Sequence, residues 1–370
     1  MKPTSSKVTT AAKKCLEKKL LIGEAAAPPH PYKPPTKGIL SMLPASWVPY
    51  AELARAHQPH GIYMIYFPQL LGLVYAASVL QQHKADSESD GLGHRRAIRN
   101  PPRPSELAYC AAAMLGWTVF WRSGLCAWND NVDQDFDRKT ARCRNRPIAR
   151  GAVSTARAHL FSLVLVLAAF ACLRLPLPPL LLPPECAQVA LGSTALGMIY
   201  PFGKRFTHYP QLILGSTLGS TVVLSAYAVG LPALAPPHRA ATACLAAAVL
   251  LLVVFYDTVY ARQDTADDLK SGVKGMAVRF RDHIEGLLAV LALSIAALLT
   301  AAGLLVGAHQ SYYLFSVAGL TVGLVSLVAL THWDLLPSWA GSSGWCYALA
   351  IANLIGGMAS QYYHLLKGSA

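Results

Sequence analysis

Residues 240–260 read AATACLAAAVLLLVVFYDTVY, an apolar run whose single acid, Asp257, comes near its end. About 20 apolar residues are enough for a helix to cross the hydrocarbon core of a bilayer. Lipid offers the backbone no hydrogen-bond partners, so a run of this kind crosses as a helix. The chain as a whole is 54% hydrophobic and only 14% charged, whereas soluble domains carry about 25% charged residues. We therefore expect an all-α protein of the membrane.

Eight further runs are similar in length and composition to residues 240–260. The nine predicted spans are 61–80, 107–128, 158–177, 186–202, 211–231, 240–260, 286–308, 311–330 and 344–366. They predict a multi-pass bundle of about nine transmembrane helices within residues 48–370. Residues 1–47 are rich in Lys and Pro and are expected to be a separate, disordered segment.

The basic residues indicate how the bundle is oriented. With a cytosolic N-terminus, the segments on that side hold 23 of the 32 Lys and Arg residues, the opposite side holds 8, and Arg122 falls inside a span. This distribution follows the positive-inside rule, so we expect the N-terminus in the cytosol. The net charge of +13 is then a consequence of topology, and we expect no nucleic-acid partner.

An acidic segment begins where the second predicted span ends. Residues 129–137 read NDNVDQDFD. At about 100° per residue, a helix would place Asp130, Asp133 and Asp137 within about 60° of one another. Asn129 would lie beside them, and Asp135 would point to the far side.

A second acidic segment begins where the sixth predicted span ends. Residues 257–268 read DTVYARQDTADD. On a helix, one stripe would hold Tyr260 together with four carboxylates, which are Asp257, Asp264, Asp267 and Asp268.

The negative charge of both stripes needs a compensating cation, because like charges at this spacing repel one another, most of all at a membrane boundary. Oxygen ligands of this kind suit Mg²⁺, which typically joins one or two carboxylates to substrate phosphates. Each segment alone could equally be a set of solvated loop acids that end a helix. Two stripes at matching positions on one side of the membrane favour a magnesium site.

Basic residues occur near the same face. Arg122 lies in a span, two turns deeper than Asn129, while Arg146 and Lys204 lie at the cytosolic face, in the sequences NRPI and YPFGKR. Each could bind phosphate oxygens, or could be a structural or topology-setting charge. Arg55, before the first span, could bind a carboxylate of a second substrate or anchor the helix.

These motifs resemble the UbiA superfamily of intramembrane aromatic prenyltransferases. Asn129, Asp130, Asp133 and Asp137 match its NDxxDxxxD motif, and residues 257–268 match DxxYAxxDxxDD. The resemblance runs from about Met42 to the C-terminus. Residues 38–50 look most like the fungal secondary-metabolite group, although the family's Arg-x-(Asp/Asn)-Lys-Pro pattern is replaced by RAHQP at residues 55–59.

The resemblance implies a helical bundle around a central cavity with a polar cytosolic cap. It implies two Mg²⁺ sites, one at Asn129, Asp133 and Asp137 and the other at Asp257, Asp264 and Asp268. The catalytic residues would be Asp133, Asp137, Asp264, Lys204 and Tyr200. Residues contacting substrates would be Arg55, Arg122, Asn129, Asp130, Arg146, Lys204, Tyr260 and Asp267. Tyr200 or Tyr260 would stabilise an allylic cation with its ring, or would simply pack between helices.

The implied reaction is transfer of a prenyl group from an isoprenyl diphosphate, farnesyl or longer, to a phenolic aromatic acid of the orsellinic type. Three alternatives stay open: a 4-hydroxybenzoate polyprenyltransferase of ubiquinone biosynthesis, a membrane-bound terpene cyclase of the same superfamily, and a transporter. The secondary-metabolite resemblance favours an endomembrane over the mitochondrial inner membrane. The N-terminal segment also has no Arg before Arg55, whereas transit peptides are rich in Arg.

Overall fold

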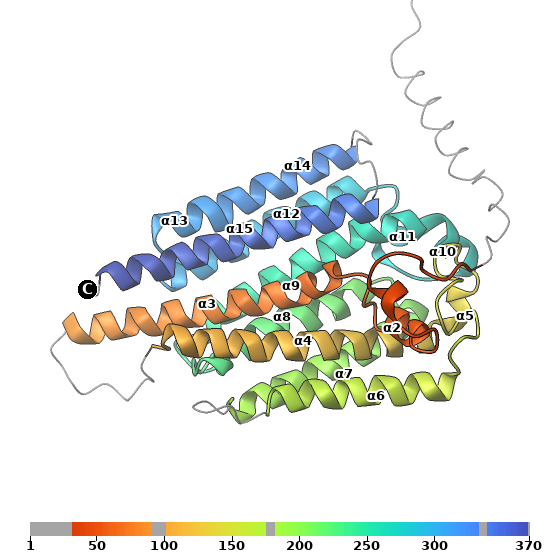
Figure 1. Ribbon diagram of the computed structural model, residues 1–370. Helices are drawn as coiled ribbons and strands as arrows, with labels where there is room; N and C mark the ends of the chain where they lie inside the picture. Colours follow the sequence, from red (N-terminus) through yellow and green to blue (C-terminus); the bar gives the residue numbers. More distant parts are fainter. Residues whose placement is uncertain (1–31, 90–100, 175–181, 333–338, 369–370) are drawn as a thin grey trace, which may run out of the picture.

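The computed structural model describes residues 32–89, 101–174, 182–332 and 339–368, and every regular element in these ranges is helical. Nine long helical segments within them run side by side (Figure 1). They are α3 (His60–Ser89), α4 (Pro104–Val132), α6 (Thr155–Cys172), α7 (Pro184–Phe206), α8 (Pro210–Ala228), α9 (Arg239–Ala261), α12 (Ile284–Leu305), the segment from α13 (Gln310–Tyr312) through the π-helix η3 (Tyr313–Gly319) to α14 (Leu320–His332), and α15 (Trp339–Gly368).

Each predicted span overlaps one of these nine segments, so the all-α class is confirmed. Six segments are long and apolar enough to cross a membrane: α3, α6, α8, α9, α12 and the segment from α13 to α14. The other three have the length, and each also buries polar side chains. Examples are the buried Thr118 on α4, Thr194 on α7 and Gln361 on α15.

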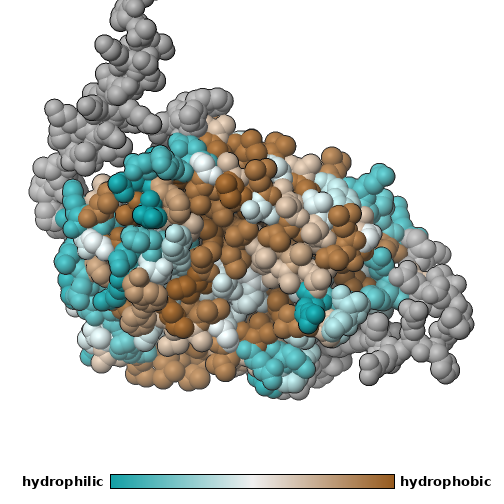
Figure 2. Space-filling model, turned by 180° about the vertical axis from the view of Figure 1, so that it is seen from behind, coloured by the Kyte–Doolittle hydropathy of each residue, from teal (hydrophilic) through white to brown (hydrophobic). Residues whose placement is uncertain are grey.

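The outer surface of the bundle is apolar. Large side chains such as Leu160 on α6, Leu293 on α12 and Val322 on α14 are all more than 60% exposed. Figure 2 shows hydrophobic residues across the middle of the molecule and hydrophilic residues gathered toward its ends. A soluble monomer rarely exposes so continuous an apolar surface. The distribution suits a belt that contacts lipid.

Helices α8 and α9 pack closely because α8 carries glycines at the contact. A Cβ atom on Gly215 or Gly219 would lie 2.6 Å from the carbonyl oxygen of Leu250 or Ala246, respectively. Small residues that let two backbones approach are typical of helix pairs in membranes, where the hydrophobic effect does not drive helices together.

The short elements gather at one end of the bundle (Figure 1). They are α2 (Val48–Leu53), α5 (Gln134–Asp137), η2 (Arg262–Asp264), α10 (Thr265–Ser271) and α11 (Met276–Arg279). They cap the ends of α4, α7 and α9, where both acidic segments lie.

The N-terminal segment is described only from residue 32. Within it, η1 (Ile39–Met42) forms one short turn, and the Tyr32 hydroxyl donates a hydrogen bond to Glu52 at 2.7 Å. Residues 1–31 lie outside the described residues, so disorder there stays a prediction.

Candidate active site

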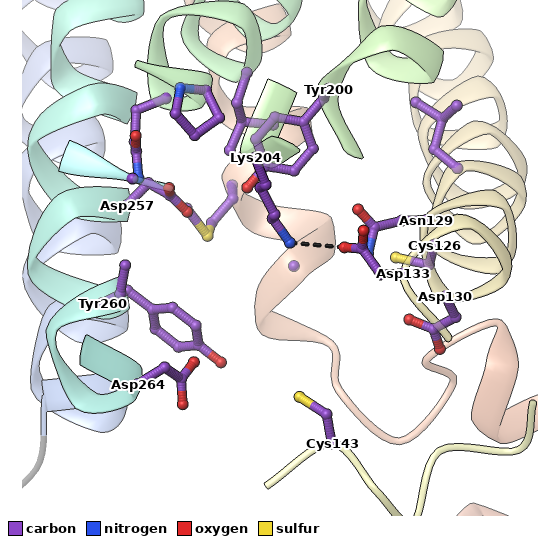
Figure 3. Close-up of a pocket in the computed structure, with 18 of the residues that line it drawn as sticks. Cys126, Asn129, Asp130, Asp133, Cys143, Tyr200, Lys204, Asp257, Tyr260 and Asp264 are labelled. Atoms are coloured by element: carbon purple, nitrogen blue, oxygen red, sulfur yellow. Dashed lines mark hydrogen bonds and ion pairs between the residues drawn. The ribbon is translucent and has the colours of Figure 1, made fainter. Parts of the chain in front are cut away.

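The two acidic segments face each other across a cavity of about 420 Å³ at the capped end of the bundle. Figure 3 shows Asn129, Asp130 and Asp133 on one side and Asp257, Tyr260 and Asp264 on the other, with Tyr200 and Lys204 between them. The walls come from α3, α4, α7, α8 and α9. Residues more than 100 positions apart thus meet in one site.

The first acidic segment is not one continuous helix. Helix α4 ends at Val132, Asp133 has φ −89° and ψ 3°, and α5 restarts the helix at Gln134. Asp130, Asp133 and Asp137 nevertheless all line the cavity and are all buried. Asp135 points away, is 74% exposed and pairs with Arg138, as the helical spacing predicts.

The second acidic segment also changes its helical geometry. Helix α9 passes through the 3-10 turn η2 into α10, and Asp257, Asp264 and Asp268 line the cavity. Asp267, expected in the same stripe, is not among the lining residues. Its carboxylate instead accepts a hydrogen bond from the backbone N–H of Ala141 at 3.3 Å. The 3-10 turn is wound more tightly than an α-helix, which offsets the expected angular positions.

Cationic side chains hold the first set of carboxylates together. Arg146 Nη1 lies 3.0 Å from oxygens of both Asp130 and Asp137. Arg55 lies 2.7 Å from the same Asp130 oxygen, and Lys204 Nζ lies 2.8 Å from Asp133. The cations therefore lie within reach of any phosphate that enters the cavity.

Tyr200 and Arg122 lie at different depths of the same cavity. The Lys204 ammonium lies 5.6 Å from the centre of the Tyr200 ring, in a cation–π arrangement. Arg122, which is buried, donates to the backbone carbonyls of Arg55 and Gln58 at 3.3 and 2.9 Å. It therefore holds the linker before α3 in place while also lining the cavity.

Sequence reasoning missed Arg142. Its Nη2 lies 2.7 Å from Asp264, its Nη1 donates to the Tyr260 hydroxyl at 3.4 Å, and its guanidinium lies 5.6 Å from the centre of the Tyr260 ring. The available signal was its place in the sequence RCRNR, four residues before Arg146. Arg142 joins the loop after the first acidic segment to the second acidic segment.

The donor set fits a hard cation. Three buried oxygens of the described residues that line the cavity have no hydrogen-bond partner, namely Asn129 Oδ1, Asp130 Oδ2 and Asp133 Oδ1. Leaving such oxygens unpaired is unfavourable, and a divalent ion would satisfy them. Among the described residues, no three acidic, His or Cys side chains already form a metal site, since Arg and Lys hold the carboxylates. Burial raises the pKa of Asp137 to about 6 in spite of the neighbouring Arg146.

Residues 97–353 match the UbiA prenyltransferase family. The chain belongs to this family. The predicted membership is thus confirmed, and the chain is a prenyltransferase and an integral membrane protein. In this UbiA chain the matched region spans both acidic segments, the intervening basic loop and most of the long helices.

Several fungal relatives of this UbiA chain match over most of its length. The prenyltransferase ascA of Acremonium egyptiacum is 59% identical over 90% of each chain. The prenyltransferase stbC of Stachybotrys bisbyi is 48% identical, over 92% of this chain and 94% of its own. The DMOA farnesyltransferase nvfB of Aspergillus novofumigatus is 36% identical, over 88% of this chain and 94% of its own.

Solved structures of UbiA homologues share the fold at low sequence identity. The homologue from Aeropyrum pernix has a TM-score of 0.58 and 22% identity, with 80% of this chain and 97% of that chain covered. A homologue from Archaeoglobus fulgidus, bound to GPP and Mg²⁺, has a TM-score of 0.54 and 16% identity, with 84% and 99% covered.

Proposed function

We propose that this chain transfers a farnesyl group from farnesyl diphosphate to the ring of an orsellinic-type phenolic acid in meroterpenoid biosynthesis. One observation carries the proposal: buried carboxylates and cations surround the mouth of a cavity whose deeper walls are mostly apolar. Such a cavity can hold a diphosphate at its mouth and a hydrocarbon below it. The printed name of nvfB, a farnesyltransferase, supports the choice of farnesyl.

Magnesium is the metal we propose for the mouth. The three unpartnered oxygens of Asn129, Asp130 and Asp133 support this proposal, as does the A. fulgidus homologue bound to GPP and Mg²⁺. Asn129, Asp133 and Asp137 would hold one ion, and Asp257, Asp264 and Asp268 a second. Bound Mg²⁺ neutralises charge that develops on the leaving diphosphate.

The cations of the chain bind the diphosphate directly. Lys204, Arg146 and Arg142, which pair with carboxylates in the structure, would donate to the phosphate oxygens of the diphosphate. The bond between C1 of the prenyl group and its oxygen breaks, and the electron pair leaves with the diphosphate. The ring faces of Tyr200 and Tyr260 stabilise the allylic cation that remains.

The acceptor completes the reaction. A ring carbon of the phenolic acid forms the new bond to C1, and the ring proton passes to a cavity carboxylate, which restores aromaticity. Arg55 is the group we propose for the acceptor carboxylate, with Arg122 fixing the linker that carries it. We further propose that the N-terminus and the site face the cytosol, since 23 of the 32 basic residues fall on that side. The proposed location is an endomembrane.

The test is transfer in membranes that contain the expressed chain. Farnesyl diphosphate, Mg²⁺ and either orsellinic acid or 4-hydroxybenzoate are supplied, and products are identified by mass spectrometry. Asp133→Ala and Asp264→Ala should each lower the rate about a hundredfold or more, because each removes part of the charge-stabilising site. Asp135→Ala is the matched control, since that acid is exposed and points away from the cavity. Chelation of Mg²⁺ should abolish transfer.

The outcomes separate the alternatives. A farnesylated orsellinic acid supports the proposal, whereas product only from 4-hydroxybenzoate and longer donors would indicate the ubiquinone-type reaction. Diphosphate release with a hydrocarbon or alcohol as the sole product would indicate a terpene cyclase. Folded protein that turns over no donor with any acceptor would leave a transport role.

A further inference from the structure

The cavity continues far below its polar mouth. On α4 its lining residues run from Asp133 down to Trp121, and on α8 they run from Pro210 down to Leu218. With a rise of about 1.5 Å per residue, the α4 wall is about 18 Å long and the α8 wall about 12 Å long. Below the acids, apolar side chains such as Met64, Leu125 and Leu214 make up most of the walls, and Arg122 and Thr217 are the polar exceptions.

This depth corresponds to a short isoprenoid. One isoprene unit adds four bonds of about 1.5 Å to the chain, which is about 5 Å in the zigzag form. A depth of about 12–18 Å therefore accepts two to three complete extended units. A fourth isoprene unit would have to extend beyond the side chain at the bottom of the cavity.

Trp121 closes the bottom. Its side chain is 1% exposed, and its ring stacks on Trp117 with centroids 4.5 Å apart and an angle of 21° between the planes. Its Nε1 donates to Thr194 Oγ1 on α7 at 2.9 Å. Trp117 is itself fully buried. The indole of Trp121 is thus held from α4 and from α7, and cannot turn aside without breaking both contacts.

Aromatic contacts also cross one side of the cavity. Tyr256, the deepest lining residue on α9, meets Tyr347 of α15 edge to face at 5.1 Å. The Tyr347 hydroxyl donates to the backbone carbonyl of Met64 on α3 at 3.0 Å. These contacts join α3, α9 and α15 along one side of the cavity.

We propose that Trp121 is the residue that sets the longest donor chain this enzyme accepts. The proposal rests on the proposed function, because it assumes that the hydrocarbon of an isoprenyl diphosphate fills the deep end. A smaller side chain at position 121 adds room along the chain axis and leaves the diphosphate contacts untouched. Loss of the hydrogen bond to Thr194 alone would loosen the Trp121 side chain, which forms the floor of the cavity, without removing it.

The test compares geranyl, farnesyl and geranylgeranyl diphosphates in the wild type, Trp121→Leu and Thr194→Val. The kcat/KM ratio of geranylgeranyl to farnesyl should rise about tenfold or more in Trp121→Leu, the range that a change of pocket size produces. Thr194→Val should shift the ratio in the same direction by less. Trp128→Leu is the matched control, because Trp128 also lies on α4 and also donates to α7, at Met198, but does not line the cavity.

Binding separates this inference from the proposed function. The affinities of farnesyl and geranylgeranyl thiodiphosphates, followed by thermal stabilisation, should shift in the same ratio in Trp121→Leu. If these analogues bind but no acceptor is prenylated, the proposed function fails and the binding ratio still tests the floor. An unchanged ratio in both Trp121→Leu and Thr194→Val, with both variants folded, overturns the inference. It would mean that the chain leaves sideways above the floor, for example past Gly344, where a Cβ atom would meet nothing within 4 Å.

Discussion

At the scale of the residue, Arg142 joins the two halves of the site through its contacts with Asp264 and Tyr260. Arg142→Ala should lower kcat/KM for prenyl transfer about tenfold, because a hydrogen bond to a charged group contributes about 1.5–3 kcal/mol. Arg138→Ala is the control: this arginine lies in the same loop but pairs with the exposed Asp135, and such a surface pair contributes about 0–1 kcal/mol. Steady-state kinetics on purified variants measures both. If kcat/KM fell equally in Arg142→Ala and Arg138→Ala, Arg142 would contribute no more to prenyl transfer than a surface arginine does.

At the scale of the element, the α8–α9 contact positions the second acidic segment, since Asp257 lies on α9. Gly219→Ala should lower the free energy of unfolding by about 1–3 kcal/mol, because the added methyl meets the Ala246 carbonyl and the helices must separate. Thermal unfolding in detergent measures the change. Gly323→Ala on α14 serves as the control. A Cβ atom there has no neighbour within 4 Å, and alanine favours a helix more than glycine does, so its melting temperature should stay equal or rise. A Gly219→Ala protein as stable as the control would contradict this account of the packing.

At the scale of the whole molecule, the apolar belt separates two polar ends, and the site lies at only one of them. Lys139→Cys, in the exposed loop after α5, should react with an impermeant thiol reagent only from the cytosolic side of sealed membranes. Leu234→Cys, in the exposed turn between α8 and α9, should react only from the other side. Labelling of the unmodified protein corrects for its native cysteines. Both positions reacting from the same side would exclude the predicted topology.

Helix positions and the face of most acids follow from local rules, and the sequence predicted them well. Apolar runs set where the nine long helices lie, because the backbone in lipid must satisfy its own hydrogen bonds. The helical period placed Asp130, Asp133 and Asp137 together and turned Asp135 away. The period could not reveal the break at Asp133 or the turn of Asp267 toward Ala141, since both depend on what packs beside the helix end.

The sequence by itself determined that this protein is a helical membrane protein with two acidic segments on one side, because length, apolarity and charge are local properties of the chain. Only the tertiary structure decided which cation meets which acid, as in the contact of Arg142 with Asp264 across 122 residues of sequence. The same holds for Trp121, which in the sequence is one apolar residue among many. It becomes the floor of a cavity only when α4 and α7 pack together and Thr194 meets its indole. Such contacts depend on how helices pack, and no local pattern encodes them.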